Sequence, residues 1–164
     1  MSFLIAAFWI FLSLTVQILL CNHMTVGGGM ALAYLYMVTR TPVEWNRSSQ
    51  ILLGFIVGFI VDMFSNTPGL HALTCVTTMW LRLPLLHVFI VADDIKNGCP
   101  TYHRLGSTVY TRFLGFVVLI HCVLLYSFES FTLFNFFNLL SKIVMSVVMT
   151  FLLVWAADVA NNTK

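Results

Sequence analysis

The chain has 164 residues, of which 60% are hydrophobic and 9% charged, and its mean hydropathy is +0.94. Soluble domains carry about a quarter charged residues, so this composition excludes an ordinary soluble domain and predicts an integral membrane protein. The formal net charge of +2 is too small to indicate nucleic-acid binding. No polar stretch is long enough for a further domain, so residues 1–164 are expected to form a single transmembrane domain.

Six apolar segments approach the roughly 20 residues that a spanning helix needs, and they predict an all-α bundle of six transmembrane helices. They cover residues 3–20, 24–39, 51–64, 70–92, 110–128 and 136–157. The first has no Lys or Arg and no small-residue cleavage site, so a retained helix is expected rather than a signal peptide. The second begins with three glycines, each of which weakens a helix by about 1 kcal/mol. Whether this short segment spans the membrane fully is left open.

The loops predict the orientation of the segments. The connections after the second and fourth segments carry Arg40, Arg47, Lys96 and Arg104, whereas those after the first, third and fifth carry no Lys or Arg. Cytoplasmic loops are the ones enriched in these residues. Both chain termini are therefore expected in the cytoplasm.

Three segments carry polar residues at helical spacing. These are Ser13, Gln17 and Cys21 in the first; His71, Thr74, Thr78 and Arg82 in the fourth; and Asn138, Lys142, Ser146 and Thr150 in the sixth. Lipid offers such groups no hydrogen-bond partner, so they should face other helices. They would then serve either as hydrogen bonds between helices or as the lining of a ligand cavity.

Signals for chemistry are weak. The sequence has no HExxH or GxSxG motif and no phosphate-cradling glycine loop. Asp93 and Asp94 are a lone acidic pair, and His71, His87 and His121 lack a spacing diagnostic of haem ligation. No catalytic residue, cofactor or metal is expected.

Gly54, Gly58 and Asp62 are spaced by four and share one face of the third segment. The glycines should let a neighbouring helix come close. A carboxylate in a membrane segment is costly unless it faces protein or water, so Asp62 should be buried against protein near the outer end. Lys142 has a similar predicted depth and is its expected partner. The alternative is that Asp62 caps the following turn through the backbone amides around residues 65–67.

The Gly-x-x-x-Gly-x-x-x-Asp run, followed by Ser-Asn-Thr-Pro-Gly-Leu-His-Ala, resembles the rod-shape-determining MreD family of bacteria. This resemblance implies a non-catalytic subunit of the elongasome in the bacterial inner membrane. Its partners would be MreC and, indirectly, the MreB filament and the glycosyltransferase–transpeptidase pair. The implied fold is similar to the substrate-binding subunit of energy-coupling-factor transporters.

Two other functions stay open: a vitamin-binding subunit of such a transporter, and a membrane enzyme acting on a lipid-linked substrate. The candidate helix-packing or partner-binding residues are Gly54, Gly58, Asp62, Pro68, Gly69, His71, Arg82 and Lys142. Arg82 is ambiguous, because it either snorkels to the cytoplasmic face or lies mid-membrane, depending on where the fourth segment ends.

Overall fold

The computed structural model describes residues 12–21, 25–26, 28–89, 99–130 and 136–161. The described chain is mostly helical, and four of its helices are long and apolar enough to cross a membrane. These are α3 (Arg47–Ser65), α4 (Leu70–Phe89), α6 (Ser107–Glu129) and α7 (Phe136–Asn161). The expectation of a largely all-α membrane protein therefore holds.

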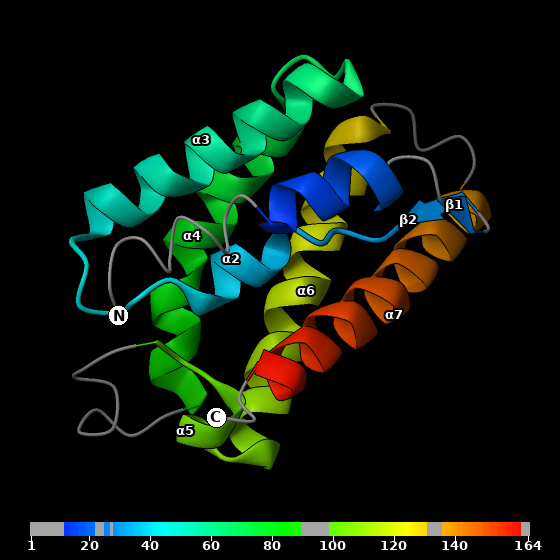
Figure 1. Ribbon diagram of the computed structural model, residues 1–164. Helices are drawn as coiled ribbons and strands as arrows, with labels where there is room; N and C mark the ends of the chain where they lie inside the picture. The colour runs from blue at the N-terminus through cyan, green and yellow to red at the C-terminus, as the bar shows by residue number, and fades with distance from the viewer. Residues whose placement is uncertain (1–11, 22–24, 27, 90–98, 131–135, 162–164) are drawn as a thin grey trace.

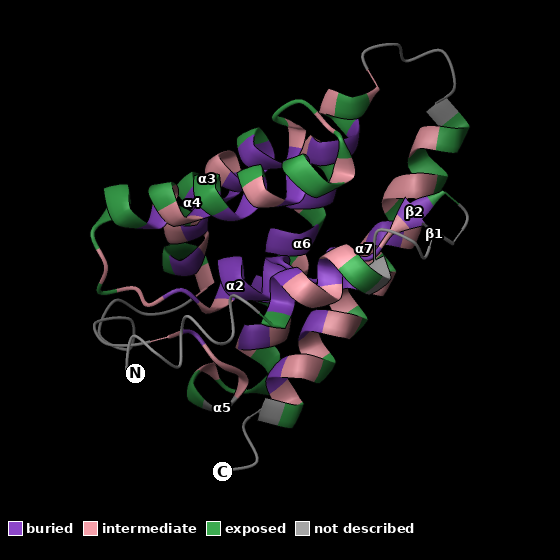
Figure 2. Ribbon diagram, turned by 45° about the horizontal axis from the view of Figure 1, so that its top comes forward, coloured by how far each residue is buried: buried purple, intermediate pink, exposed green. Residues whose placement is uncertain are grey.

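The long helices pack in chain order, α3 against α4, α4 against α6, and α6 against α7. The short helix α2 (Leu35–Arg40) contacts α4, α6 and α7 and lies in the middle of the molecule (Figure 1). Its residues from Leu35 to Thr39 are buried, and they form the centre of the core (Figure 2). A second short helix, α5 (Tyr102–Leu105), precedes α6, and Gly106 joins the two at a φ of 78°.

The third to sixth predicted segments correspond to α3, α4, α6 and α7, although residues 90–92 lie outside the described residues. Of the first segment, residues 12–16 are helical and η1 (Gln17–Cys21) continues them as a π-helix; residues 3–11 lie outside the described part. Single π-turns of this kind widen a helix and are frequent at functional sites.

The prediction of one helix over residues 24–39 is wrong. Strands β1 (Thr25–Val26) and β2 (Gly29–Met30) pair as a small antiparallel hairpin, and residues 31–34 are irregular before α2 begins. Gly28 adopts a φ of +79° in the hairpin turn, which is a conformation that glycine tolerates best. Residues 24 and 27 lie outside the described residues.

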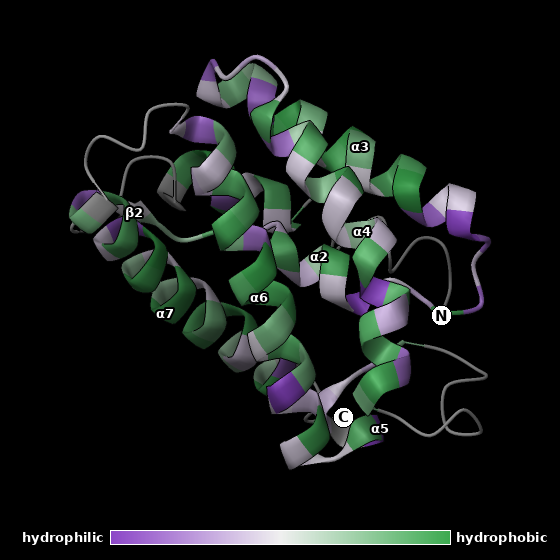
Figure 3. Cartoon of the chain, turned by 180° about the vertical axis from the view of Figure 1, so that it is seen from behind, coloured by the Kyte–Doolittle hydropathy of each residue, from purple (hydrophilic) through white to green (hydrophobic). Residues whose placement is uncertain are grey.

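The outward faces of the long helices are apolar. Large exposed hydrophobic side chains recur along them: Leu52, Phe55, Ile56, Phe59 and Met63 on α3, Phe116, Leu119 and Val123 on α6, and Leu140, Val144, Val148 and Leu152 on α7. The ribbons are correspondingly hydrophobic over most of their length (Figure 3). In a membrane this surface would meet lipid tails, as expected of spanning helices.

Candidate functional site

The glycines of α3 bring it into direct contact with α4. A Cβ added at Gly58 would lie 2.6 Å from the Cα of Ala72 and from the carbonyl oxygen of His71. A Cβ at Gly54 would lie 2.8 Å from Cγ of Met79. The close approach expected from the glycine spacing is thus present, and it leaves no room for a side chain at Gly58.

Asp62 links the end of α3 to the start of α4. It is 4% exposed, and its Oδ1 accepts hydrogen bonds from the Thr67 hydroxyl at 2.6 Å and the His71 amide at 2.9 Å. Its Oδ2 accepts one from the Ala72 amide at 2.8 Å. The carboxylate therefore satisfies two of the unpaired amides of the first turn of α4, at the end where the helix dipole favours negative charge.

The predicted pairing of Asp62 with Lys142 is wrong. The Lys142 ammonium lies 4.0 Å from Oε1 of Glu129, and both side chains are roughly half exposed. The amides of α4 and the Thr67 hydroxyl occupy the Asp62 carboxylate instead. The alternative, in which Asp62 accepts hydrogen bonds from backbone amides, is correct, but these amides belong to the first turn of α4 rather than to residues 65–67.

Pro68 and Gly69 form the exposed turn between the two helices. Gly69 has a φ of +80°, and a Cβ there would meet no atom within 4 Å. Asn66 also has a positive φ, of 54°, where α3 ends. These residues shape the turn that places Asp62 beneath α4.

The polar stripe of α7 accepts hydrogen bonds from the end of β2 and from the irregular stretch that leads to α2. The Met30 amide donates to Oγ of Ser146 at 2.9 Å, and the Leu32 amide donates to Oγ1 of Thr150 at 3.0 Å. At membrane depth, non-helical backbone is tolerated only where protein satisfies its hydrogen bonds. Ser146 and Thr150 thus replace the helical hydrogen bonds that this stretch lacks.

Gln17 of η1 also satisfies the backbone of this stretch, because its Oε1 accepts a hydrogen bond from the Ala33 amide at 2.6 Å. Gly29 permits this arrangement: a Cβ there would lie 2.8 Å from Oγ of Ser146. Most of the predicted stripe residues are accordingly buried. Asn138 is exposed and Lys142 is partly exposed, so these two are exceptions, and the side chain of Cys21 lies outside the described part of the chain.

A hydrogen-bonded chain runs through the centre of the bundle. The Tyr34 hydroxyl lies 3.0 Å from Nδ1 of His71 and 2.8 Å from Nε2 of His121. Nδ1 of His121 lies 2.9 Å from Oγ1 of Thr78, which donates to the carbonyl oxygen of Thr74 at 2.8 Å. All five residues are buried. His71 and His121 thus lie on either side of one tyrosine, which their spacing in the sequence does not indicate.

Arg82 lies inside the protein and does not snorkel. It is fully buried, and its guanidinium donates to the carbonyl oxygens of Thr39 and Thr41 and, at 3.0 Å, to Oε1 of Gln50. It therefore binds the carbonyl end of α2, where the helix dipole favours a cation.

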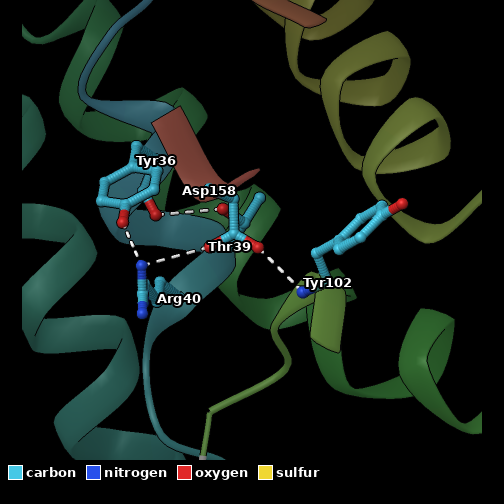
Figure 4. A network of polar contacts seen from close by, with 5 residues as sticks. All are labelled: Tyr36, Thr39, Arg40, Tyr102 and Asp158. Carbon is cyan, nitrogen blue, oxygen red and sulfur yellow. Dashed lines mark hydrogen bonds and ion pairs between the residues drawn. The ribbon is translucent and has the colours of Figure 1, made fainter. Parts of the chain in front are cut away.

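Sequence reasoning missed an ionic cluster at the same end of α2. Arg40 donates to Oδ1 of Asp158 at 3.2 Å and also to the Tyr36 hydroxyl (Figure 4). Oδ2 of Asp158 accepts the Tyr102 amide at 2.8 Å, so this carboxylate ties α7 to α2 and α5. Thr39 closes the cluster by donating to the Tyr36 carbonyl oxygen at 3.0 Å. A carboxylate in the last turns of an apolar segment was the signal that could have revealed it.

A cavity of about 390 Å³ opens beside the α3–α4 turn. Apolar side chains form much of its wall, and polar ones come from the turn, from α4 and from the end of α6. Its lining consists of Ile18, Gly28, Met30, Phe64, Ser65, Thr67, Leu70, His71, Leu125, Tyr126 and Glu129. The cavity therefore connects the outside with His71 at one end of the central hydrogen-bonded chain.

Within the described residues, no group of three or more His, Cys, Asp or Glu side chains could hold a metal ion. His87 on α4 is exposed, whereas His71 and His121 are buried. Asp93 and Asp94 lie outside the described residues.

Comparisons with protein-family models, with curated proteins and with solved structures find no match to this chain.

Proposed function

We propose that this chain is a non-catalytic membrane scaffold subunit of the bacterial cell-wall elongation machinery and that it binds MreC. In this proposal it crosses the inner membrane six times, with both termini in the cytoplasm, and the second crossing is partly non-helical. The overall fold would then be similar to the substrate-binding subunit of energy-coupling-factor transporters.

The observation that carries the proposal is the α3–α4 hairpin. The residues on which the resemblance to the MreD family rests are not scattered in space. Gly58 contacts the start of α4 and Asp62 caps it, so the residues of the motif lie together at one end of the hairpin, next to the turn at Gly69. A closely packed hairpin with an apolar outer face is suited to packing against the single membrane helix of a partner.

The charge distribution supports the proposed orientation. Arg47 begins α3, at the end of that helix opposite the α3–α4 turn, and Arg40 pairs with Asp158 in the last turn of α7, whereas the cavity is lined by the end of α3, the start of α4 and the end of α6. By the positive-inside rule, the end with the arginines would face the cytoplasm and the cavity would face outward.

The cavity favours one second candidate, a small-molecule binding subunit of a vitamin transporter. Its volume of about 390 Å³ lies in the range of small-ligand sites, which are mostly apolar with a few polar groups. An outward-facing opening is what a receptor of this kind would need.

Affinity purification in mild detergent separates the two candidates. The scaffold proposal expects MreC as the main co-purifying chain, with its yield lowered by Gly58→Leu because that substitution forces α3 away from α4. Gly115→Leu, on an α6 position with no atom closer than 3.9 Å to an added Cβ, is the matched control. Recovery of an ATPase module without MreC would overturn the scaffold proposal and favour the transporter.

A further inference from the structure

The cavity beside the α3–α4 turn exposes two hydrogen-bond acceptors that the protein itself leaves unused. One belongs to His71, which is 6% exposed and lines the cavity. Its Nδ1 is engaged by Tyr34 at 3.0 Å, and no hydrogen bond of its Nε2 is found within the described part of the chain. The other is the carboxylate of Glu129.

The direction of the hydrogen bonds in the central chain determines whether Nε2 of His71 is a donor or an acceptor. The Thr78 hydroxyl has a single hydrogen, and it goes to the Thr74 carbonyl oxygen at 2.8 Å because that oxygen can only accept. Thr78 must therefore accept a hydrogen from Nδ1 of His121 at 2.9 Å. A fully buried imidazole among neutral groups is uncharged, since an unpaired charge is costly there. Nε2 of His121 is then an acceptor.

The argument continues through Tyr34 to the cavity. The Tyr34 hydroxyl donates its one hydrogen to Nε2 of His121, so its oxygen accepts from Nδ1 of His71. A neutral His71 that carries its hydrogen on Nδ1 has a lone pair on Nε2. The ring therefore offers an acceptor, not a donor, to whatever fills the cavity.

Glu129 adds a carboxylate to the lining of the cavity. Its carboxylate is roughly half exposed and forms an ion pair with Lys142 at 4.0 Å, which is too long for a hydrogen bond, so its capacity to accept hydrogen bonds is left for an occupant. Tyr126, the other polar group of α6 in the lining, is already bonded to Ser146 and Met30. An occupant with several hydrogen-bond donors and a positive charge would satisfy both unused acceptors.

We propose that this cavity binds the primary amine of a small amphipathic molecule. The ammonium group donates to Nε2 of His71 and to the Glu129 carboxylate, and the apolar part lies against Phe64, Leu70 and Leu125. Such an amine is carried either by a lipid headgroup or by a free molecule. The proposal stands on the cavity alone, and it holds whether the subunit is a scaffold or a transporter component.

The test uses the full chain in phosphatidylcholine nanodiscs and native mass spectrometry to count bound molecules. Octylamine should bind as one saturable copy, at least about tenfold more tightly than octyltrimethylammonium, which has the charge but no N–H donor, because hydrogen bonds to charged groups contribute that much. Octanol should also bind more weakly. Equal affinity for octylamine and octyltrimethylammonium, or no saturable octylamine binding, would overturn the proposal.

Variants assign the binding to the cavity. Glu129→Gln should weaken octylamine binding by about tenfold, while Glu44→Gln, an exposed carboxylate outside the cavity, should not change it. Leu70→Trp, which fills the cavity, should abolish binding in protein whose thermal midpoint shows that it is folded. An unchanged affinity in Glu129→Gln would contradict the assignment.

A final arm identifies the source of the amine. If the ligand is a lipid, phosphatidylethanolamine from phosphatidylethanolamine nanodiscs should stay bound when the protein is released from the nanodisc in the mass spectrometer. It should also displace octylamine. A free amine would instead bind equally well in both kinds of nanodisc. Either result is consistent with the amine chemistry, and neither depends on whether MreC co-purifies.

Discussion

Replacement of Asp62 tests the geometry of the α3–α4 hairpin most directly. Its carboxylate accepts the amides of His71 and Ala72 and the hydroxyl of Thr67. Asp62→Leu keeps the approximate shape but removes every acceptor. Asp62→Asn removes the charge but keeps one oxygen, which can stay in the Oδ1 position and continue to accept from Thr67 and His71.

The two substitutions should differ in magnitude. A buried backbone amide without an acceptor costs about 1–3 kcal/mol, and Asp62→Leu leaves two of them, so the loss should be about 2–6 kcal/mol. Asp62→Asn leaves only the Ala72 amide, which faces an NH₂ group, and should cost about 1–3 kcal/mol. The Thr67 hydroxyl can rotate toward another acceptor and contributes less.

Equilibrium unfolding in mixed micelles gives the free energies, with Glu44→Gln as a control for loss of an exposed carboxylate. An Asp62→Asn variant as unstable as Asp62→Leu would refute the cap, because the charge itself would then be what matters. Lys142→Met should add independently to Asp62→Asn, since the two residues share no contact. A double mutant more stable than Asp62→Asn alone would restore Lys142 as the ionic partner.

Three further outcomes are expected. Gly58→Ala should destabilise the protein by roughly 1–3 kcal/mol, because its Cβ meets backbone at 2.6 Å, while Gly115→Ala should be neutral or slightly stabilising in the same unfolding assay. Thr150→Val should cost about 1–3 kcal/mol by leaving a buried amide without an acceptor. Thr77→Val should cost little, because that hydroxyl bonds only within its own helix; equal losses for the two would contradict the role given to Thr150. A cysteine at Arg104, in a chain whose native thiols are replaced, should resist an impermeant reagent in intact cells, and labelling there would reverse the proposed orientation.

The sequence predicts those parts of the fold that depend on local periodicity. Long apolar runs identify the four long helices, and the spacing of Gly54 and Gly58 indicates a close neighbour. The burial of Asp62 follows from the cost of a carboxylate in lipid. Each of these inferences uses only residues within one segment.

The predictions that were wrong or missing concern contacts between distant segments. Residues 30–39 are apolar enough for a helix, but side chains from distant segments satisfy the backbone of residues 30–33, so no helical hydrogen bonds are needed there. The partner of Asp62 could not be found by matching charges and depths, because a backbone amide carries no signal in the sequence. The link between Arg40 and Asp158 joins residues 118 positions apart and depends on the path of α2.

Polarity inside this bundle is therefore not in itself a sign of a binding site. Ser146, Thr150 and Gln17 each accept a backbone amide, and Arg82 binds the carbonyl end of α2, so the fold itself requires these groups. His71 and Glu129 differ, because each has an acceptor that no hydrogen bond in the described part of the chain uses, and both line one cavity. Substitutions of the first group should change the free energy of unfolding, whereas Glu129→Gln should change octylamine binding and leave stability almost unaltered. That separation follows from hydrogen bonding alone and needs no assumption about the partner of this subunit.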